Sequence, residues 1–200
     1  MTCFGITGPD PYPVQPFYFI KEKIMKLRNI AAGLLAATAL SVTSLSANAT
    51  EGAFYRCINA QVTNFDGTIV DAAVATPQLS TLVELVTAAG LGEALATTEN
   101  ITVYAPTNAA FEKVDQAVLS AIGGNTDVLS AVLTYHVTPS LQDPRRFSQP
   151  TARPTLAGQQ VFMFHDGRKA RVNGSVVDCK GVKTSNGLVW LIDSVLLPQF

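Results

Sequence analysis

The side chains that could perform acid–base, nucleophilic or metal chemistry are few and do not stand in catalytic patterns. The chain has two histidines, His136 and His165, and neither belongs to an H-E-x-x-H motif or has carboxylates at metal-ligand spacing. Asp166 follows His165, but the pair Asp166-Gly167 is typical of a tight hairpin turn. The dipeptide Gly174-Ser175 lacks the flanking glycines of a nucleophile elbow, and no phosphate-binding glycine loop occurs. The sequence therefore predicts no enzyme, no cofactor and no metal site.

His136 and its neighbour Tyr135 are the residues most suited to a binding pocket. His136 extends the apolar stripe of a helix expected over residues 126–136, because it stands two helical turns after Val128. That position turns the ring inward, where a neutral histidine with hydrogen-bonded nitrogens is expected. The alternative is a pocket residue, beside which Tyr135 offers an aromatic face and a hydroxyl. We expect replacement of His136 by Ala to lower the melting temperature more than it changes partner binding.

Charge is sparse and unevenly distributed along the chain. The 14 Lys and Arg stand against 15 Asp and Glu, a net charge of −1, and this excludes the basic excess typical of nucleic-acid binders. Residues 51–127 hold nine acids and two bases, whereas residues 143–193 hold eight bases and four acids. The asymmetry indicates either two solvated faces of opposite sign, or a basic surface that meets an anionic polymer or the acidic half of another copy.

The candidate binding residues on the basic side begin in residues 143–154, a segment rich in Pro and Arg that is expected to be a surface loop. They are Arg145, Arg146 and Arg153, to which Arg168, Lys169 and Arg171 of a later hairpin could add. Exposed charges of this kind predict binding to anionic polysaccharide that weakens as salt rises, because salt screens them over about 8 Å at physiological ionic strength.

The N-terminal region is typical of a targeting sequence. A short basic start, an apolar run over residues 30–40 and the cleavage-site pattern Ala47-Asn48-Ala49 predict a signal peptide over residues 25–49. An uncleaved anchor is the alternative, but serines and threonines dilute a span of marginal length. Residues 1–24 are interpreted as a non-native upstream extension, with a genuine extension as the alternative. The exported protein is expected to be secreted or periplasmic and to keep no membrane span.

Export also decides how the cysteines are interpreted. Cys3 lies outside the mature chain, so Cys57 and Cys179 remain, an even number in an oxidising compartment. A disulfide between them is expected and should contribute about 4–5 kcal/mol by closing a long loop. Two unpaired buried thiols are the alternative.

The hydrophobic periodicity of the first half predicts helices. Residues 79–89 carry a one-sided apolar stripe that stops at Gly90, and residues 115–122 and 126–136 are further candidates. Residues 101–105 alternate as a strand does. The helix starts are expected at polar caps, either Thr107 or Asn108 for one helix and either Asn125 or Thr126 for another.

The second half predicts strands. They are expected over residues 160–165, 168–172, 175–179, 188–192 and 195–197. Asp166-Gly167 is expected to form a two-residue type I′ turn, with a second turn at Asn173-Gly174. A helical first half followed by a strand-rich second half predicts an α+β domain.

Three segments resemble the signature segments of fasciclin-like domains. Residues 102–111 (TVYAPTNAAF) are similar to the first signature, residues 133–137 (LTYHV) to the central tyrosine–histidine segment and residues 186–198 (NGLVWLIDSVLLP) to the closing signature. The structural-motif residues that these segments supply are Thr107, Asn108, Asn186, Gly187 and Asp193. Trp190 stands where many members carry His, and residues 141–153 depart from the usual segment.

The resemblance implies a single fasciclin-like domain over residues 68–198, preceded by an N-terminal segment over residues 50–67. It implies a β-sandwich wedge with helices packed along it. It also implies a non-catalytic module for adhesion to the extracellular matrix or cell envelope. The expected partner is a cell-surface or matrix protein or, given the basic residues, an anionic polysaccharide.

A carrier of an apolar small molecule is the alternative function, since some members of the family bind ligands such as carotenoids. The aromatic side chains available for such a ligand are Phe147, Phe162, Phe164 and Trp190. Their positions in alternating strands favour a role in the core over a role in ligand binding.

Overall fold

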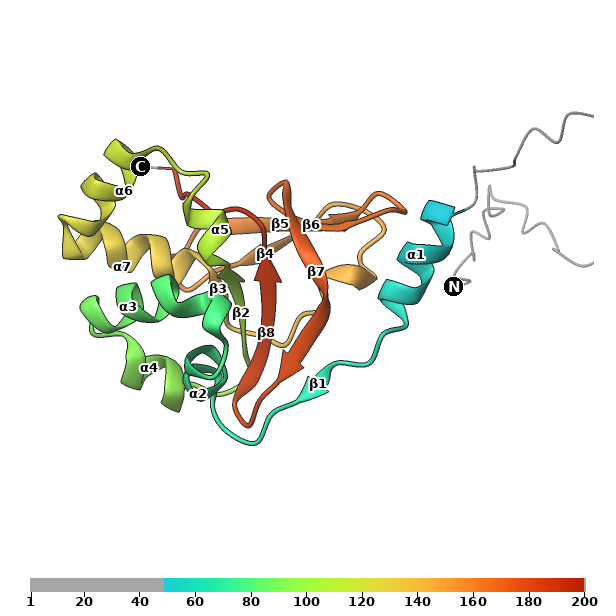
Figure 1. Ribbon diagram of the computed structural model, residues 1–200, viewed down its shortest axis with the longest axis horizontal. Coiled ribbons are helices and arrows are strands. Elements are labelled where there is room, and N and C mark those ends of the chain that lie inside the picture. Colours follow the sequence, from blue (N-terminus) through green and yellow to red (C-terminus); the bar gives the residue numbers. More distant parts are fainter. Residues whose placement is uncertain (1–48, 200) are drawn as a thin grey trace, which may run out of the picture. The chain divides into compact units, whose positions relative to one another are not determined.

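A computed structural model describes residues 49–199 of the chain (Figure 1). Its helices are α1 (Ala49–Ile58), α2 (Ile69–Val74), α3 (Ser80–Ala88), α4 (Gly92–Thr97), α5 (Asn108–Phe111), α6 (Gln116–Gly123) and α7 (Thr126–Tyr135), with 3₁₀ turns η1 (Pro77–Leu79) and η2 (Pro144–Arg146). Its strands are β1 (Thr63–Asn64), β2 (Ile101–Pro106), β3 (Val137–Thr138), β4 (Thr151–Pro154), β5 (Gln160–His165), β6 (Ala170–Val172), β7 (Ser175–Lys183) and β8 (Gly187–Ile192). The predicted signal peptide and upstream extension lie outside the described residues, apart from Ala49.

Local signals in the sequence set the helix boundaries. Helix α3 ends before Gly90, whose φ of +68° suits a residue without a side chain. Helix α7 begins after Asn125, whose side chain accepts hydrogen bonds from the backbone N–H groups of Asp127 and Val128 at 2.9 and 3.2 Å. The predicted helices over residues 79–89, 115–122 and 126–136 are therefore confirmed within a residue or two at each end.

Seven of the strands form one strongly curled path in the order β3-β2-β8-β7-β6-β5-β4, and β1 lies off this path, parallel to β7. Strands β2 and β8 run parallel at its centre, and β7 pairs antiparallel with β8. At the two ends of the path, the N–H of Leu156, which follows β4, donates to the carbonyl of Val137 in β3 at 2.8 Å. This bond nearly closes the sheet on itself. The predicted α+β class, helical first and strand-rich afterwards, is confirmed.

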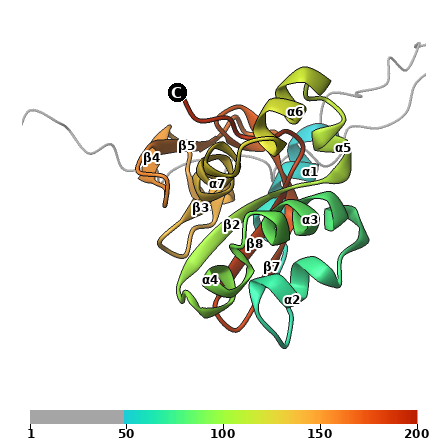
Figure 2. The ribbon, with the colours of Figure 1, turned by 90° about the vertical axis from the view of Figure 1, so that its left-hand side faces the viewer.

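Two separate cores stabilise the domain. The first lies between the helices and the outer face of β2 and β8, and includes Leu82, Val103 and Val189. Figure 2 shows α2, α3 and α4 in front of these strands. The second core fills the inside of the curled sheet and includes Met163 and Trp190. Strand β2 is consequently buried on both faces, and for this reason its burial does not alternate although its sequence does.

The hairpin turns differ from the prediction in one respect. The type I′ geometry lies at Asn173-Gly174, where φ is +47° and +85°, between β6 and β7. The connection between β5 and β6 is longer, because His165 pairs with Ala170 across residues 166–169. The prediction of a two-residue loop at Asp166-Gly167 is wrong, as is that of a strand over residues 195–197.

Among residues 49–199, no single helix has the length and apolar character needed to cross a bilayer. Only α6 and α7 taken together, with a bend of 107° between them, reach those limits, and they do so on length and composition alone.

Candidate functional site

Asn186 in the closing signature connects the end of the sheet to two helices. Its Oδ1 accepts from the N–H of Ile69 at 2.9 Å, and its Nδ2 donates to the carbonyls of Leu95 and Thr98 at 2.8 and 2.9 Å. The next residue must be Gly187, because a Cβ there would collide with the Ile101 carbonyl. This signature pair fixes α2 and α4 against the sheet and leaves no polar atom free for a ligand.

Asn108 fixes the start of a helix that precedes it in the sequence. Its Oδ1 accepts from the N–H of Thr81 at 3.2 Å, and its Nδ2 donates to the hydroxyl of Ser80 at 2.9 Å, both in the first turn of α3. Thr107 precedes α5 with extended backbone angles but makes no side-chain capping bond. Thr107 thus occupies the predicted N-cap position of α5 but makes no capping bond, and Asn108 binds across to α3 instead.

Asp193 connects the ends of β8 and β7. Its Oδ1 accepts from the N–H of Val176 at 2.8 Å, and its Oδ2 lies 3.5 Å from the ammonium of Lys113. Burial opposes ionisation, yet the pKa of Asp193 lies below its usual value because these donors and two serine hydroxyls stabilise the carboxylate. Asp193 is thus a charged structural anchor.

His136 is a core residue whose two ring nitrogens are both in use. Only 2% of it is exposed; Nδ1 lies 2.8 Å from the carbonyl of Val132, and Nε2 lies 2.9 Å from the N–H of Leu196. These partners require a proton on Nδ1 and a lone pair on Nε2, so the ring is neutral. Burial lowers the pKa of His136 to about 4, although the bond to Val132 opposes the shift. The inward orientation expected from the sequence is found.

Tyr135 points into the other core and is equally committed. Its hydroxyl donates to the carbonyl of Gln160 at 3.1 Å and accepts from Nδ2 of Asn173 at 2.7 Å. Oδ1 of Asn173 in turn accepts from the N–H of Phe162 at 2.8 Å. Asn173 therefore joins α7 to the β5–β6 hairpin, a role that its Asn-Gly turn signal did not reveal. Tyr135 and His136 do not share a pocket.

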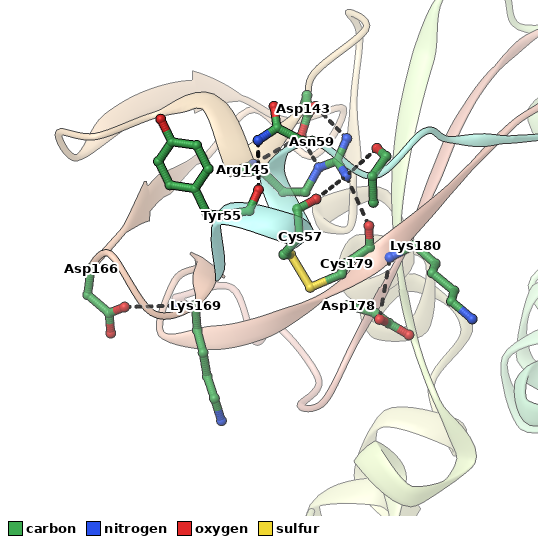
Figure 3. Close-up of a disulfide and its surroundings, with 11 residues drawn as sticks. Tyr55, Cys57, Asn59, Asp143, Arg145, Asp166, Lys169, Asp178, Cys179 and Lys180 are labelled. Atoms are coloured by element: carbon green, nitrogen blue, oxygen red, sulfur yellow. Dashed lines mark hydrogen bonds and ion pairs between the residues drawn. A yellow bond between two sulfur atoms is a disulfide. The ribbon is translucent and has the colours of Figure 1, made fainter. Parts of the chain in front are cut away.

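Arg145 is buried, which contradicts its predicted place in an exposed basic patch. Only 3% of it is exposed, and its Nη1 donates to the carbonyls of Cys57, Ala60 and Cys179 at 2.8, 3.0 and 3.0 Å. These three carbonyls attract the guanidinium inward (Figure 3).

Two further groups balance the buried charge. Asp143 accepts from both Nε and Nη2 of Arg145 at 2.9 Å, which is a bidentate ion pair. The guanidinium carbon lies 4.6 Å from the ring centroid of Trp190, and the indole Nε1 donates to the carbonyl of Gln142 at 2.9 Å. Trp190 is therefore part of the fold.

Cys57 and Cys179 form the predicted disulfide, which links α1 to β7 across 122 residues (Figure 3). It lies directly beside the Arg145 cluster, since Arg145 binds the carbonyls of both cysteines. Phe54, one turn earlier in α1, packs on His165 with the ring centroids 4.9 Å apart. The disulfide, Arg145 and Phe54 together attach α1 to the sheet.

The other two candidate arginines lie at the surface in different states. Arg146 has 70% of its side chain exposed and a single ion pair, 3.4 Å from Asp143. Arg153 is half-buried; its guanidinium lies 5.2 Å from the Phe147 ring and its Nε donates to Gln142 at 3.3 Å. The predicted cluster of three arginines therefore does not form one exposed patch.

The β5–β6 connection holds exposed cations. Arg168 and Lys169 are exposed and make no ion pair with any described residue. Asp166 accepts from both of their backbone N–H groups at 2.8 Å, which fixes the loop. Arg171 lies 3.6 Å from Asp166 and donates to the Gly174 carbonyl at 2.9 Å. Arg168, Lys169 and Arg171 are the three hairpin bases that the sequence suggested as additions to the basic surface.

Two apolar cavities lie on the helical side of the sheet. One of about 170 Å³ lies between α3, α6 and α7 and is lined by Leu85, Phe111, Leu119, Leu129, Val132 and Val195. The second, of about 70 Å³, lies between α2, α3, α4 and the strands β2 and β8. Leu133 and His136 border both. None of the four aromatic residues predicted for an apolar ligand lines either cavity.

Within residues 49–199, no three His, Cys, Asp or Glu side chains gather as metal ligands. Every buried side-chain nitrogen and oxygen described there has a hydrogen-bond partner. The buried polar side chains described there are therefore all held by hydrogen bonds.

Comparison with known proteins identifies relatives of this arrangement. Immunogenic protein MPB70 of Mycobacterium bovis is 39% identical over 97 residues, which are 48% of this chain and 49% of that protein. The cell surface glycolipoprotein MPB83 of Mycobacterium bovis is 37% identical over 97 residues, which are 48% of this chain and 43% of that protein. The chain thus spans about half the length of these relatives.

A solved structure and a family model both relate this chain to fasciclin domains. The FAS1 domain pair of the insect cell adhesion molecule fasciclin I superposes with a TM-score of 0.54 at 14% identity, covering 66% of this chain and 51% of that one, which establishes a shared fold. Residues 77–198 match the model described as the fasciclin domain. Because that match spans more than half of the sequence, the chain belongs to the fasciclin domain family.

Proposed function

We propose that this chain is a non-catalytic adhesion module, exported from the cytoplasm, whose outer surface binds a partner in the extracellular matrix or cell envelope. One observation carries this: the buried polar side chains of the three signature segments all make hydrogen bonds within the fold, and no buried side-chain nitrogen or oxygen among the described residues lacks a partner. A domain whose interior serves only the fold acts through its exterior.

The relatives support an extracytoplasmic, surface-directed role. One is named a cell surface glycolipoprotein, and the structural neighbour comes from a cell adhesion molecule. The disulfide between Cys57 and Cys179 agrees with export, because such bonds persist in oxidising compartments. The partner would be a surface or matrix protein or an anionic polysaccharide, and the protein would be secreted or periplasmic.

Binding to fractions of the source cells tests the proposal. The exported protein, tagged at its C-terminus, is titrated onto washed cell envelopes and onto extracellular matrix material, with thermally unfolded protein as the control. We expect saturable binding of the folded protein to at least one fraction. Absence of binding to all fractions, or turnover of ester, glycoside or peptide substrates, would overturn the proposal.

A carrier of a small apolar molecule is the second candidate, and the cavity of about 170 Å³ is the observation that favours it. A dry apolar cavity of about 150 Å³ is known to accept a single aromatic ring, whereas a long polyene such as a carotenoid is far larger. Solvent extraction and mass spectrometry of protein from its native source provide the test. A bound one-ring or short-chain molecule, lost on Leu129→Trp substitution, supports the carrier; an empty extract contradicts it.

A further inference from the structure

The outer face of the hairpin sheet is an uncovered surface with a regular composition. The pairing register places Phe164 of β5 opposite Arg171 of β6, and Arg171 opposite Val176 of β7. Phe162 lies two residues before Phe164 and therefore points to the same side. We call these four side chains the hairpin face. Phe164, Arg171 and Val176 form a row across three strands, with the cation between two apolar groups.

Helices α2–α7 leave this face open. The sheet side chains that pack against these helices come from β2, β3, β7 and β8, whereas β5 and β6 contribute only to the inner core among the described residues. Figure 1 shows β5 and β6 extending away from α2–α7. Phe162 is 49% exposed, although its neighbours in β5, Val161 and Met163, are fully buried. Phe162 therefore offers part of an aromatic ring to solvent beside Phe164 on the outer side of β5.

The charges around the face are positive and held in place. Within residues 166–171, the cations Arg168, Lys169 and Arg171 stand beside a single carboxylate, that of Asp166. Hydrogen bonds from the N–H groups of Lys169 and Arg168 lower the pKa of Asp166, so it stays ionised and keeps the loop ordered. Lys169 is exposed, and its side chain extends away from the disulfide (Figure 3).

We propose that the hairpin face binds an acidic polysaccharide, with the rings of Phe162 and Phe164 against the C–H faces of the sugars and Arg168, Lys169 and Arg171 on their carboxylate or sulfate groups. This rests on the proposed adhesion function and names its surface and partner class. Guanidinium and ammonium groups suit these anions, and exposed aromatic faces suit the apolar sides of pyranose rings.

Other partner classes fit the face less well. A peptide that adds a strand needs a free sheet edge, and both edges of β5 and of β6 are occupied by neighbouring strands. The surface carries too few bases to neutralise a nucleic-acid backbone. A second copy of the chain could bring its acidic helical half to the face, and the experiment below includes that outcome.

The test compares binding to three immobilised polymers: a polyuronate, dextran sulfate and neutral dextran. The variants are Lys169→Glu, Phe162→Thr and, as the matched control, Lys183→Glu. Lys183 is also exposed and free of ion pairs among the described residues, but it lies at the far end of β7 beside β1. Circular dichroism verifies that each variant is folded.

We expect the wild type to bind one or both acidic polymers and not neutral dextran, with an affinity that falls as NaCl is raised. Lys169→Glu should weaken binding about 5-fold, the range of an exposed ion pair, and Phe162→Thr about 5- to 10-fold. Lys183→Glu should change it less than 2-fold. Two results would overturn the inference: equal losses at Lys169 and Lys183, or full binding by Phe162→Thr.

Failure of the inference can be told from failure of the adhesion function. If the wild-type protein binds cell envelopes but neither acidic polymer, the polysaccharide proposal is rejected and the adhesion function stands. Concentration-dependent self-association in sedimentation, abolished by Lys169→Glu, would assign the face to a second copy and overturn the inference. If the protein binds neither envelopes nor polymers, both proposals are rejected.

Discussion

The buried polar groups of the signature segments and the surface around the hairpin face use polar residues in opposite ways. Around Asn186 and His136, each polar group has its partners within the fold. Beside the hairpin face, Arg168 and Lys169 have no ion-pair partner among the described residues. The segments that identify the family therefore explain why the domain folds, while the surface that would select a partner lies between them. Four measurements would break or sharpen this contrast.

The largest effect is expected for Asn186→Ala. The substitution leaves the N–H of Ile69 and the carbonyls of Leu95 and Thr98 without their shared partner inside the protein. We expect a loss of about 4 kcal/mol in the free energy of unfolding, because each stranded buried group costs about 1–3 kcal/mol. Urea denaturation measures it. Asn125→Ala is the control, an exposed helix cap for which about 1 kcal/mol is expected. Equal losses at the two positions would contradict the interior role of Asn186.

The second measurement compares the stability lost on replacing two adjacent arginines, the buried Arg145 and the exposed Arg146. Arg145→Ala removes a buried charge from three carbonyls, Asp143 and the Trp190 ring, and we expect a loss of about 3 kcal/mol in unfolding free energy. Arg146→Ala removes one exposed ion pair and should cost less than about 0.5 kcal/mol. Thermal unfolding of both variants decides the point. If Arg145→Ala proves as stable as Arg146→Ala, then Arg145 is not part of the interior.

The stability of the domain should depend on pH through His136. Its pKa falls from 6.5 to about 4 on folding, so the unfolded chain binds more protons between these values. The free energy of unfolding should therefore be greatest above about pH 6.5 and should fall by about 3 kcal/mol as the pH drops towards 4. Urea titrations at several pH values measure the slope. His136→Gln should be less stable at pH 7 and should lack this part of the slope. An unchanged slope would mean that His136 is not buried and neutral.

The sequence predicts much of the fold because its signals are local. A glycine at positive φ after α3, the Asn125 cap and the 3.6-residue stripes of α3 and α7 each depend on a few neighbouring residues. The inward position of His136 follows from its helix alone. The cysteine pairing was predictable because only two cysteines remain after the predicted signal peptide.

The errors arise where distant backbone decides the outcome. Arg145 stands in a segment rich in Pro and Arg that is typical of a loop, and no sequence pattern shows that carbonyls 88 and 34 residues away attract its guanidinium inward. Asn108 resembles a local cap but binds α3, 27 residues earlier. Asp-Gly and Asn-Gly both suit a type I′ turn, yet Asp166 accepts two N–H groups of its own loop and thereby stabilises a longer connection.

The smallest effect is expected on the hairpin face, and one pair of adjacent residues measures it. Phe162 and Met163 follow each other in β5 but point to opposite sides, one half exposed and the other fully buried. Phe162→Thr keeps a residue suited to strands and removes a ring that water already reaches, so the free energy of unfolding should change by less than about 0.5 kcal/mol. Met163→Ala opens a cavity in the inner core and should cost about 2–5 kcal/mol. Paired urea denaturation curves provide the measurement. A loss above about 2 kcal/mol for Phe162→Thr would show that its ring holds the fold together, and the hairpin face would then have no aromatic group to offer a partner.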